Sequence, residues 1–231
     1  MLHAQGLDHF YGESHTLWEL AIDVPAGTCT CLMGRNGVGK TTLLKCVMGL
    51  LPVRAGEIMF EGQNLVKLPA ERRAPLGIGY VPQGREIFPR LTVEENLRIG
   101  LSTRGGQARG ALDPIYEMFP VLKRMLRRRG GDLSGGQQQQ LAIGRALVLE
   151  PRLLILDEPT EGIQPNVVHE IGEVISRLNR ERGITVLLVE QKLPFARRIA
   201  DRFCVMDKGR VVANGAMNEL TDDLVRQYLA V

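Results

Sequence analysis

The segment from Gly34 to Thr42, Gly-Arg-Asn-Gly-Val-Gly-Lys-Thr-Thr, constrains the fold more than any other stretch of the chain. Its spacing matches the phosphate-binding pattern G-x-x-x-x-G-K-[ST]. The apolar run from Cys29 to Met33 predicts a strand before it, and the pattern from Lys40 to Leu50 predicts a helix after it. A glycine-rich turn at a helix N-terminus directs backbone N–H groups and the helix dipole at phosphate oxygens. The segment therefore predicts a nucleotide site made by Gly34, Arg35, Asn36, Gly37, Val38, Gly39, Lys40, Thr41 and Thr42.

A second apolar run, from Leu153 to Leu156, ends in two acids, Asp157 and Glu158. A buried strand delivers such residues to the carboxyl edge of a sheet, where ligands bind in open α/β folds. We expect Lys40 to reach the β- and γ-phosphates and Thr41 and Asp157 to hold Mg²⁺. Glu158 would orient or deprotonate the attacking water. The alternative, a strand that ends at an exposed acidic turn, is weakened by the phosphate loop.

Apolar runs and helical patterns alternate along the 231 residues and predict an α/β fold. Leu2–Leu7 and Leu17–Val24 alternate apolar and polar residues, which indicates antiparallel strands with one wet face, joined through a turn at Phe10–Gly12. Leu153–Leu156 and Val186–Val189 do not alternate, so they are expected in a parallel sheet covered on both faces. The sheet is therefore expected to be mixed and mainly parallel, beside an antiparallel part.

Between about residues 84 and 150 the pattern is mostly helical, with interruptions at Gly105–Gly106 and Gly130–Gly131. Capping boxes at Thr92 and Ser134 mark two helix starts in this block. We expect a single domain, with a core of about residues 1–83 and 151–231 and a helical subdomain of about 84–150 inserted into it.

The composition adds few constraints. A net charge of +3 is too small to indicate nucleic-acid binding by itself. The four cysteines lack metal-ligand spacing and are expected as buried thiols, and Trp18 is expected to pack on a half-buried strand. No secretory signal is visible at the start, and no apolar run approaches the roughly 20 residues that span a bilayer. If the chain works at a membrane, another protein is expected to recruit it.

The segment Leu133-Ser134-Gly135-Gly136-Gln137 follows the phosphate loop and precedes the two acids. With these motifs in this order, the chain resembles the ATP-binding cassette (ABC) ATPases over essentially its whole length. The resemblance implies a RecA-like P-loop core and ATP with Mg²⁺ as ligands. It also implies that Ser134, Gly135, Gly136 and Gln137 meet the γ-phosphate held by another subunit, so that two subunits enclose two nucleotides.

The resemblance implies further roles outside these motifs. Tyr11 would stack on the adenine, although a tyrosine in a turn is otherwise often a packing residue. Gln83 would link Mg²⁺ and the water to the helical block, or else be a plain turn residue. Gln191 stands where most relatives have a histidine that senses the γ-phosphate, and Gln164 where many have an aspartate. Since the amide of Gln191 does not take up a proton as an imidazole does, proton transfer would depend on Glu158 or on the substrate phosphate.

With these departures the chain resembles the ATPases of the importer group for branched-chain amino acids and amides. The segments that carry this resemblance are Val189–Gln191, Glu161–Gly162 and Gly84–Pro89. Within that group, Glu161–Asn166 looks most like the urea-importer ATPases. The resemblance implies a peripheral subunit at the cytoplasmic face of the inner or plasma membrane. Its implied partners are a second ATPase subunit, two permease subunits and, indirectly, an extracytoplasmic solute-binding protein, with no nucleic acid. The alternatives are an importer ATPase for branched-chain amino acids or amides, a soluble cassette ATPase outside transport, and an ATP-binding regulatory module.

Overall fold

The structure of the chain is a computed structural model that describes residues 1–102 and 110–229. Its strands are β1 (Leu2–Tyr11), β2 (Ser14–Val24), β3 (Cys29–Met33), β4 (Ala55–Phe60), β5 (Gln63–Asn64), β6 (Ile78–Val81), β7 (Leu153–Asp157), β8 (Thr185–Val189), β9 (Arg202–Asp207) and β10 (Arg210–Ala216). Its helices are α1 (Lys40–Met48), α2 (Ala70–Arg73), α3 (Val93–Ser102), α4 (Asp113–Met118), α5 (Pro120–Arg124), α6 (Gly135–Leu147), α7 (Pro165–Arg180), α8 (Leu193–Ile199) and α9 (Asp222–Tyr228). No helix in these described ranges is long and apolar enough to cross a membrane.

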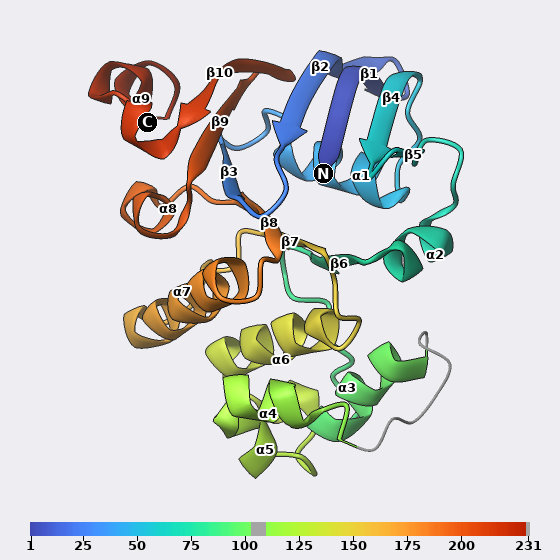
Figure 1. Ribbon diagram of the computed structural model, residues 1–231, viewed down its shortest axis with the longest axis vertical. Helices are drawn as coiled ribbons and strands as arrows, with labels where there is room; N and C mark the ends of the chain where they lie inside the picture. Colours follow the sequence, from blue (N-terminus) through green and yellow to red (C-terminus); the bar gives the residue numbers. More distant parts are fainter. Residues whose placement is uncertain (103–109, 230–231) are drawn as a thin grey trace.

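Two sheets form the upper part of the molecule in Figure 1. The larger has the order β10-β9-β3-β8-β7-β6, in which β10 is antiparallel to β9 and the other neighbours are parallel. The smaller is antiparallel, with the order β2-β1-β4-β5. The expected mixed sheet with a separate antiparallel part is therefore confirmed. Strand β3, which leads into the phosphate loop, lies inside the large sheet between β8 and β9.

Helix α1 fills the space between the sheets. Its Leu43, Leu44 and Val47 belong to one buried cluster with inward residues of β1, β2 and β4 and with one face of β3, β7 and β8. The opposite face of the large sheet packs on α6, α7 and α8 in a second cluster. Covering on both faces explains why β7 and β8 are apolar at nearly every position and buried throughout. The four cysteines lie buried and unpaired, as expected.

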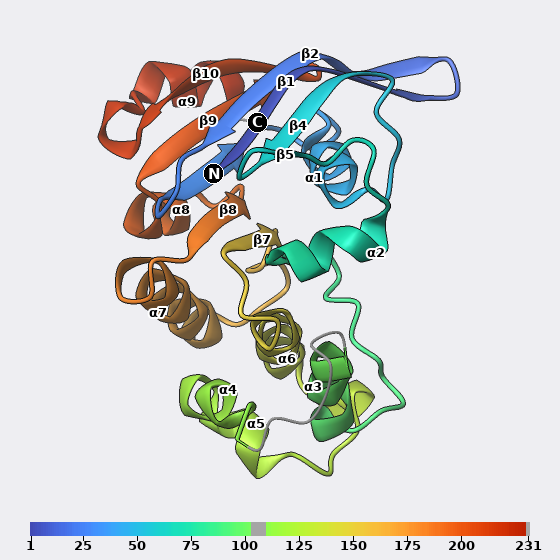
Figure 2. The same ribbon diagram turned by 45° about the vertical axis from the view of Figure 1, so that its right-hand side comes forward.

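Helices α3 to α6 gather at the end of the molecule beyond β6 and β7, with α6 nearest the sheet (Figures 1 and 2). The two expected capping boxes are present: Thr92 exchanges bonds with Glu95, and Ser134 with Gln137. The expected interruption at Gly130–Gly131 is a short 3-10 turn, whereas the one at Gly105–Gly106 lies outside the described residues. The division into a core and an inserted helical subdomain stays a prediction.

One expectation about the first hairpin was wrong, and its second strand is irregular. Phe10 and Tyr11 belong to β1, which leaves only Gly12 and Glu13 as the turn. Trp18 is 41% exposed, although strict alternation from Leu20 would turn it inward. An irregularity at Glu19, whose φ is +43°, shifts the phase of β2, so that Leu17 and Leu20 both point into the core. Trp18 packs instead on the solvent face of the sheet.

Candidate nucleotide site

The phosphate loop joins the carboxyl end of β3 to the N-terminus of α1. Gly34 has a φ of +150°, and a Cβ there would overlap the carbonyl of Met206. Gly39 has a φ of +105°, and a Cβ there would lie 3.0 Å from the Leu17 side chain. Glycine is required at both places because neighbouring strands leave no room for a side chain. The loop and the loops after β6, β7 and β8 line an open pocket of about 550 Å³.

Lys40 lies in this pocket, 95% buried. Its ammonium donates to the carbonyls of Gly34, at 2.7 Å, and Arg35, at 2.9 Å. Burial lowers the pKa of Lys40, and the charges of Glu158 and Asp157 act in the opposite direction. These contacts fix a cation at the mouth of the loop, where a phosphate chain would neutralise it.

Asp157 ends β7 and is 1% exposed. Neither carboxylate oxygen has a hydrogen-bond partner. Burial raises the pKa of Asp157 to about 6, while the neighbouring Thr41 hydroxyl lowers it and the charge of Glu158 raises it. A buried carboxylate with unsatisfied oxygens beside a threonine hydroxyl is oxygen-donor chemistry that suits Mg²⁺. Asp157 and Thr41 therefore fit the ion that the sequence predicted for them.

Glu158 follows Asp157 in a left-handed conformation, with φ at +49°. Non-glycine residues adopt this conformation rarely, and it often occurs at functional sites. The Glu158 carboxylate accepts from Gln191 Nε2 at 2.6 Å, and the same amide donates to Asn36 Oδ1 at 2.7 Å. Gln191 thus uses both N–H groups to connect the loops after β7 and β3. The connection fixes the direction of the Glu158 carboxylate in the pocket.

Gln83 follows β6 and also lines the pocket. Its Nε2 donates to Glu161 Oε2 at 3.0 Å, on the loop that carries Glu158. The structure therefore brings together the phosphate loop, Gln83, Glu158 and Gln191, all of which were expected from the sequence. Their assigned roles stay predictions.

The residues from Ser134 to Gln137, called the signature residues below, lie elsewhere, at the start of α6 (the signature helix). Ser134 caps α6, with its Oγ 3.4 Å from the Gln137 N–H, and the Gln137 side-chain oxygen accepts from the Ser134 N–H at 3.0 Å. None of Ser134, Gly135, Gly136 and Gln137 lines the pocket of the phosphate loop. Figures 1 and 2 place α6 in the lower part of the molecule and α1 in the upper part. One chain therefore presents two separate surfaces, consistent with a site completed by another subunit.

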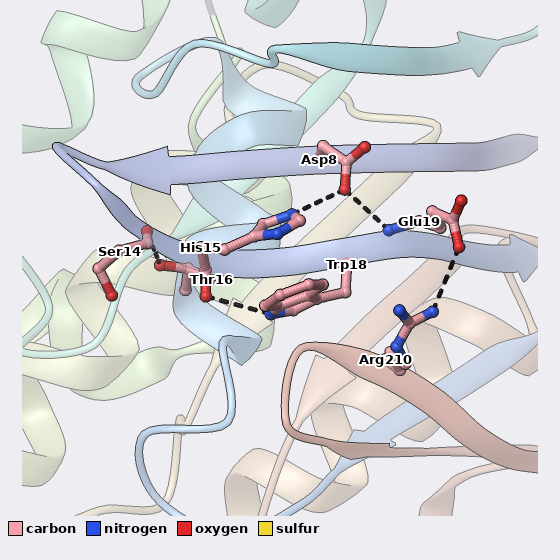
Figure 3. A network of polar contacts seen from close by, with 7 residues as sticks. All are labelled: Asp8, Ser14, His15, Thr16, Trp18, Glu19 and Arg210. Carbon is pink, nitrogen blue, oxygen red and sulfur yellow. Dashed lines mark hydrogen bonds and ion pairs between the residues drawn. The ribbon is translucent and has the colours of Figure 1, made fainter.

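Tyr11 ends β1 and is 49% exposed, with its ring edge-on to His9 at 4.7 Å. It is not among the residues that line the pocket. Figure 3 shows how the adjacent hairpin is fixed: Asp8 Oδ1 lies 2.8 Å from His15 Nε2 and accepts from the Glu19 N–H at 3.0 Å. The His15 ring also stacks on Trp18, at 3.6 Å between centroids. This bracing holds the end of the hairpin, and with it an exposed tyrosine face suited to stacking on a base.

Sequence reasoning missed the group behind Gln191. Glu190 is 2% exposed and accepts from the Thr160 hydroxyl at 3.0 Å and from the N–H groups of Gln191 and Lys192. Burial raises the pKa of Glu190, and these hydrogen bonds lower it. Lys192 Nζ in turn donates to the Thr160 carbonyl at 2.9 Å. A charged residue at the end of an apolar strand was the available signal, but its partner lies 30 residues away.

Comparisons with known proteins agree with this arrangement. Residues 17–161 match the family model described as ABC transporter. The chain is 43% identical to the high-affinity branched-chain amino acid transport ATP-binding protein BraG of Pseudomonas aeruginosa, over 92% of this chain and 91% of that protein. It is 38% identical to the probable branched-chain amino acid transport ATP-binding protein LivF of Archaeoglobus fulgidus, over 96% of this chain and 94% of that protein.

Solved structures show the same fold. A dimeric ATP-binding cassette in a post-hydrolysis state, bound to ADP and Pi, superposes with a TM-score of 0.85 at 25% identity, over 94% of this chain and 99% of that one. The family model covers more than half of the chain, and the curated relatives cover nearly all of it. The chain therefore belongs to the ABC transporter family and is an ATP-binding cassette that hydrolyses ATP.

Proposed function

We propose that the chain is the ATP-hydrolysing subunit of an importer for branched-chain amino acids or closely related amides. The observation that carries the proposal is the pocket in which Lys40, Glu158 and Gln191 converge, next to a buried carboxylate suited to a metal. The solute class follows from the relatives, two of which are named for branched-chain amino acid transport. The chain would act at the cytoplasmic face of the membrane, bound to permease subunits.

In this proposal ATP is the substrate, and catalysis consists mainly of positioning and charge stabilisation. Lys40 and the backbone N–H groups of the loop bind the phosphates. Thr41 and Asp157 hold Mg²⁺, which when bound neutralises charge on the phosphate oxygens. Glu158, held by Gln191, orients the attacking water and accepts its proton. The surface from Ser134 to Gln137 completes the site of a second ATPase subunit.

The complex would contain two ATPase subunits, two permease subunits and an extracytoplasmic protein that binds the solute. The test is ATP turnover by the co-purified complex in lipid vesicles. We expect Glu158→Gln to reduce kcat by at least about 100-fold, because it removes the proton acceptor, while ATP binding persists. Glu173→Gln changes an exposed carboxylate of α7 and serves as the matched control. An inactive wild-type complex, or full turnover by Glu158→Gln, would refute the proposal.

Urea is a second candidate solute, favoured by the segment Glu161-Gly162-Ile163-Gln164-Pro165-Asn166, which runs from the loop after β7 into the first residues of α7. This chain does not itself bind the solute, so the distinction requires the whole complex. Leucine and urea should be added separately to vesicles that contain the complex with its solute-binding protein. Stimulation of ATP turnover by leucine alone supports the branched-chain solute, and stimulation by urea alone supports the second candidate.

A further inference from the structure

Arg85 is a half-buried arginine in the loop after β6, and neither the sequence motifs nor the pocket assigns it a role. Its guanidinium contacts two parts of the fold, which are also linked further along α6 by the hydrogen bond from Gln140 to Glu170 at 3.0 Å. Nη1 donates to the side-chain oxygen of Gln138, in the first turns of α6, at 3.1 Å. Nη2 makes a longer bond, 3.5 Å, to the backbone carbonyl of Glu161. Arg85 therefore joins the signature helix to the loop that carries the catalytic carboxylate.

The contacts on each side of Arg85 continue to functional residues. The Glu161 N–H donates to the Glu158 carbonyl at 3.1 Å, so the arginine is two hydrogen bonds from Glu158. The Glu161 side chain also accepts from Gln83, so Gln83 and Arg85, both in the loop after β6, donate to the same residue, Glu161. On the other side, Gln138 donates to the Gly130 carbonyl at 3.3 Å, which fixes the side chain that Arg85 contacts.

The backbone around Arg85 is shaped for this reach. Gly84, Arg85 and Glu86 are left-handed in succession, with φ values of +81°, +73° and +46°. Two consecutive non-glycine residues in this region are strained, and such strain persists only where neighbouring contacts hold it. Here Arg145, on α6, donates to the Glu86 carbonyl at 2.8 Å. Helix α6, which Arg85 contacts through Gln138, therefore also stabilises the turn that orients the Arg85 side chain.

Glycine at position 135 makes room for the guanidinium. A Cβ on Gly135 would lie 3.1 Å from Arg85 Nη2 and 3.2 Å from Nη1, which is closer than ordinary packing allows. Arg85 has no carboxylate partner among the described residues, and its two acceptors are neutral. A cation beside a helix N-terminus is electrostatically disfavoured. Geometry rather than charge pairing therefore explains its position.

We propose that Arg85 is a positioning residue for the two-subunit nucleotide site, coupling the orientation of the α6 N-terminus to that of the Glu158 loop. The inference rests on the proposed function, because only a shared site requires the two surfaces to keep one relative position. Arg85 is not among the residues that line the phosphate-loop pocket of its own chain. Its loss should lower turnover and leave ATP binding by the isolated chain unchanged.

The experiment compares ATP turnover by the complex with Arg85→Ala, Arg85→Lys, Gln138→Ala and the double variant Arg85→Ala/Gln138→Ala. We expect Arg85→Ala to lower kcat about tenfold, with the Kd for ATP of the isolated chain unchanged within about twofold. Because lysine cannot reach two acceptors in a fork, Arg85→Lys should recover only part of kcat. The double variant should be no slower than the slower single variant, which is the signature of a shared contact. Arg127→Ala, on an exposed arginine, is the control.

Several results would overturn the inference while the wild-type complex stays active. One is kcat of Arg85→Ala within twofold of wild type. A second is a loss of ATP affinity in Arg85→Ala as large as its loss of kcat. A third is a wild-type kcat in Arg85→Lys. A fourth is a loss of kcat in the double variant equal to the product of the two single losses. Thermal melting of each isolated chain identifies general destabilisation, and Arg85→Lys gives a second reading if Arg85→Ala melts early. An inactive wild-type complex, by contrast, refutes the proposed function.

Discussion

Arg73 offers a quantitative test of how the phosphate-loop helix is held. It closes α2 and is 3% exposed. Its guanidinium donates four hydrogen bonds to three backbone carbonyls: two to Leu68, at 2.9 and 2.8 Å, one to Cys46, at 2.8 Å, and one to Val47, at 2.7 Å. The last two carbonyls belong to the final turn of α1; the Cys46 carbonyl also accepts from the Gly49 N–H at 3.1 Å, so the Val47 carbonyl depends more on Arg73.

The change Arg73→Met keeps most of the buried stem and removes every donor. Hydrogen bonds from a charged group contribute about 1.5–3 kcal/mol each, and the buried guanidinium loses much of that sum through its own desolvation. Since the substitution also removes these donors from the Leu68 and Val47 carbonyls, at about 1–3 kcal/mol for each unsatisfied carbonyl, we expect a net loss of about 3–5 kcal/mol in the free energy of unfolding. For a chain of this length the melting temperature should then fall by roughly 10 °C.

The assay is urea unfolding of the isolated chain, followed by circular dichroism. Arg72→Met is the matched control, because Arg72 is the adjacent residue of α2 and is exposed. Its effect should stay within about 0.5 kcal/mol. Arg73 lies at the end of α1 remote from the phosphate loop, so the folded Arg73→Met chain should still bind ATP. Unfolding of both variants at the same urea concentration would show that the buried contacts do not stabilise the fold.

Three further predictions concern the site. Tyr11→Ala should weaken ATP binding by the isolated chain about tenfold through loss of base stacking, whereas Phe88→Ala, on an aromatic of similar exposure outside this hairpin, should leave the Kd unchanged; equal effects would contradict the stacking role. Gln191→His should add an acid limb near pH 6.5 to the pH profile of kcat, because an imidazole titrates there and an amide does not; unchanged profiles would show that residue 191 does not act on the reacting groups. Burial raises the pKa of Asp157 in the folded chain to about 6, from 3.8. The folded chain therefore binds this proton more tightly than the unfolded chain. When EDTA keeps the site free of metal, the folded state should lose stability as the pH rises from about 4 to 6. In urea unfolding at about pH 8, the free energy of unfolding of Asp157→Asn should therefore exceed that of the wild type by up to about 3 kcal/mol, and at about pH 5 by much less. A difference that does not change with pH would refute this account.

Much of the nucleotide site was predictable because its chemistry is local in sequence. The phosphate loop needs glycines, a lysine and a threonine at fixed offsets, and backbone sterics impose that spacing on any chain. The capping boxes at Thr92 and Ser134 are local for the same reason, since each joins residues three positions apart. The acids after β7 were recognisable because a strand buried on both faces leaves an unbroken apolar run before them.

The phase of β2 shows where local reasoning fails. Alternation predicts which face a residue occupies only while the strand stays regular. The irregularity at Glu19 reverses the phase, and nothing in the neighbouring residues announces it. Trp18 therefore lies on the solvent face of the sheet, where regular alternation from Leu20 would not place it. Arg73 is a similar case, because a four-residue helix rich in charge predicts exposure, and only the carbonyls of α1 explain its burial.

The sequence by itself determined the family of the chain, the glycine-rich turn between β3 and α1, and the strand that leads to the two acids. Only the tertiary structure decided that Gln191 joins Glu158 to Asn36, across 33 and 155 residues, and that Arg85 joins α6 to Glu161. The physical reason is the range of the interactions. Turn and cap geometry depends on a few adjacent dihedral angles, whereas these side-chain contacts depend on the order of strands in the sheet. That order is set by burial over the whole chain, and no local segment encodes it.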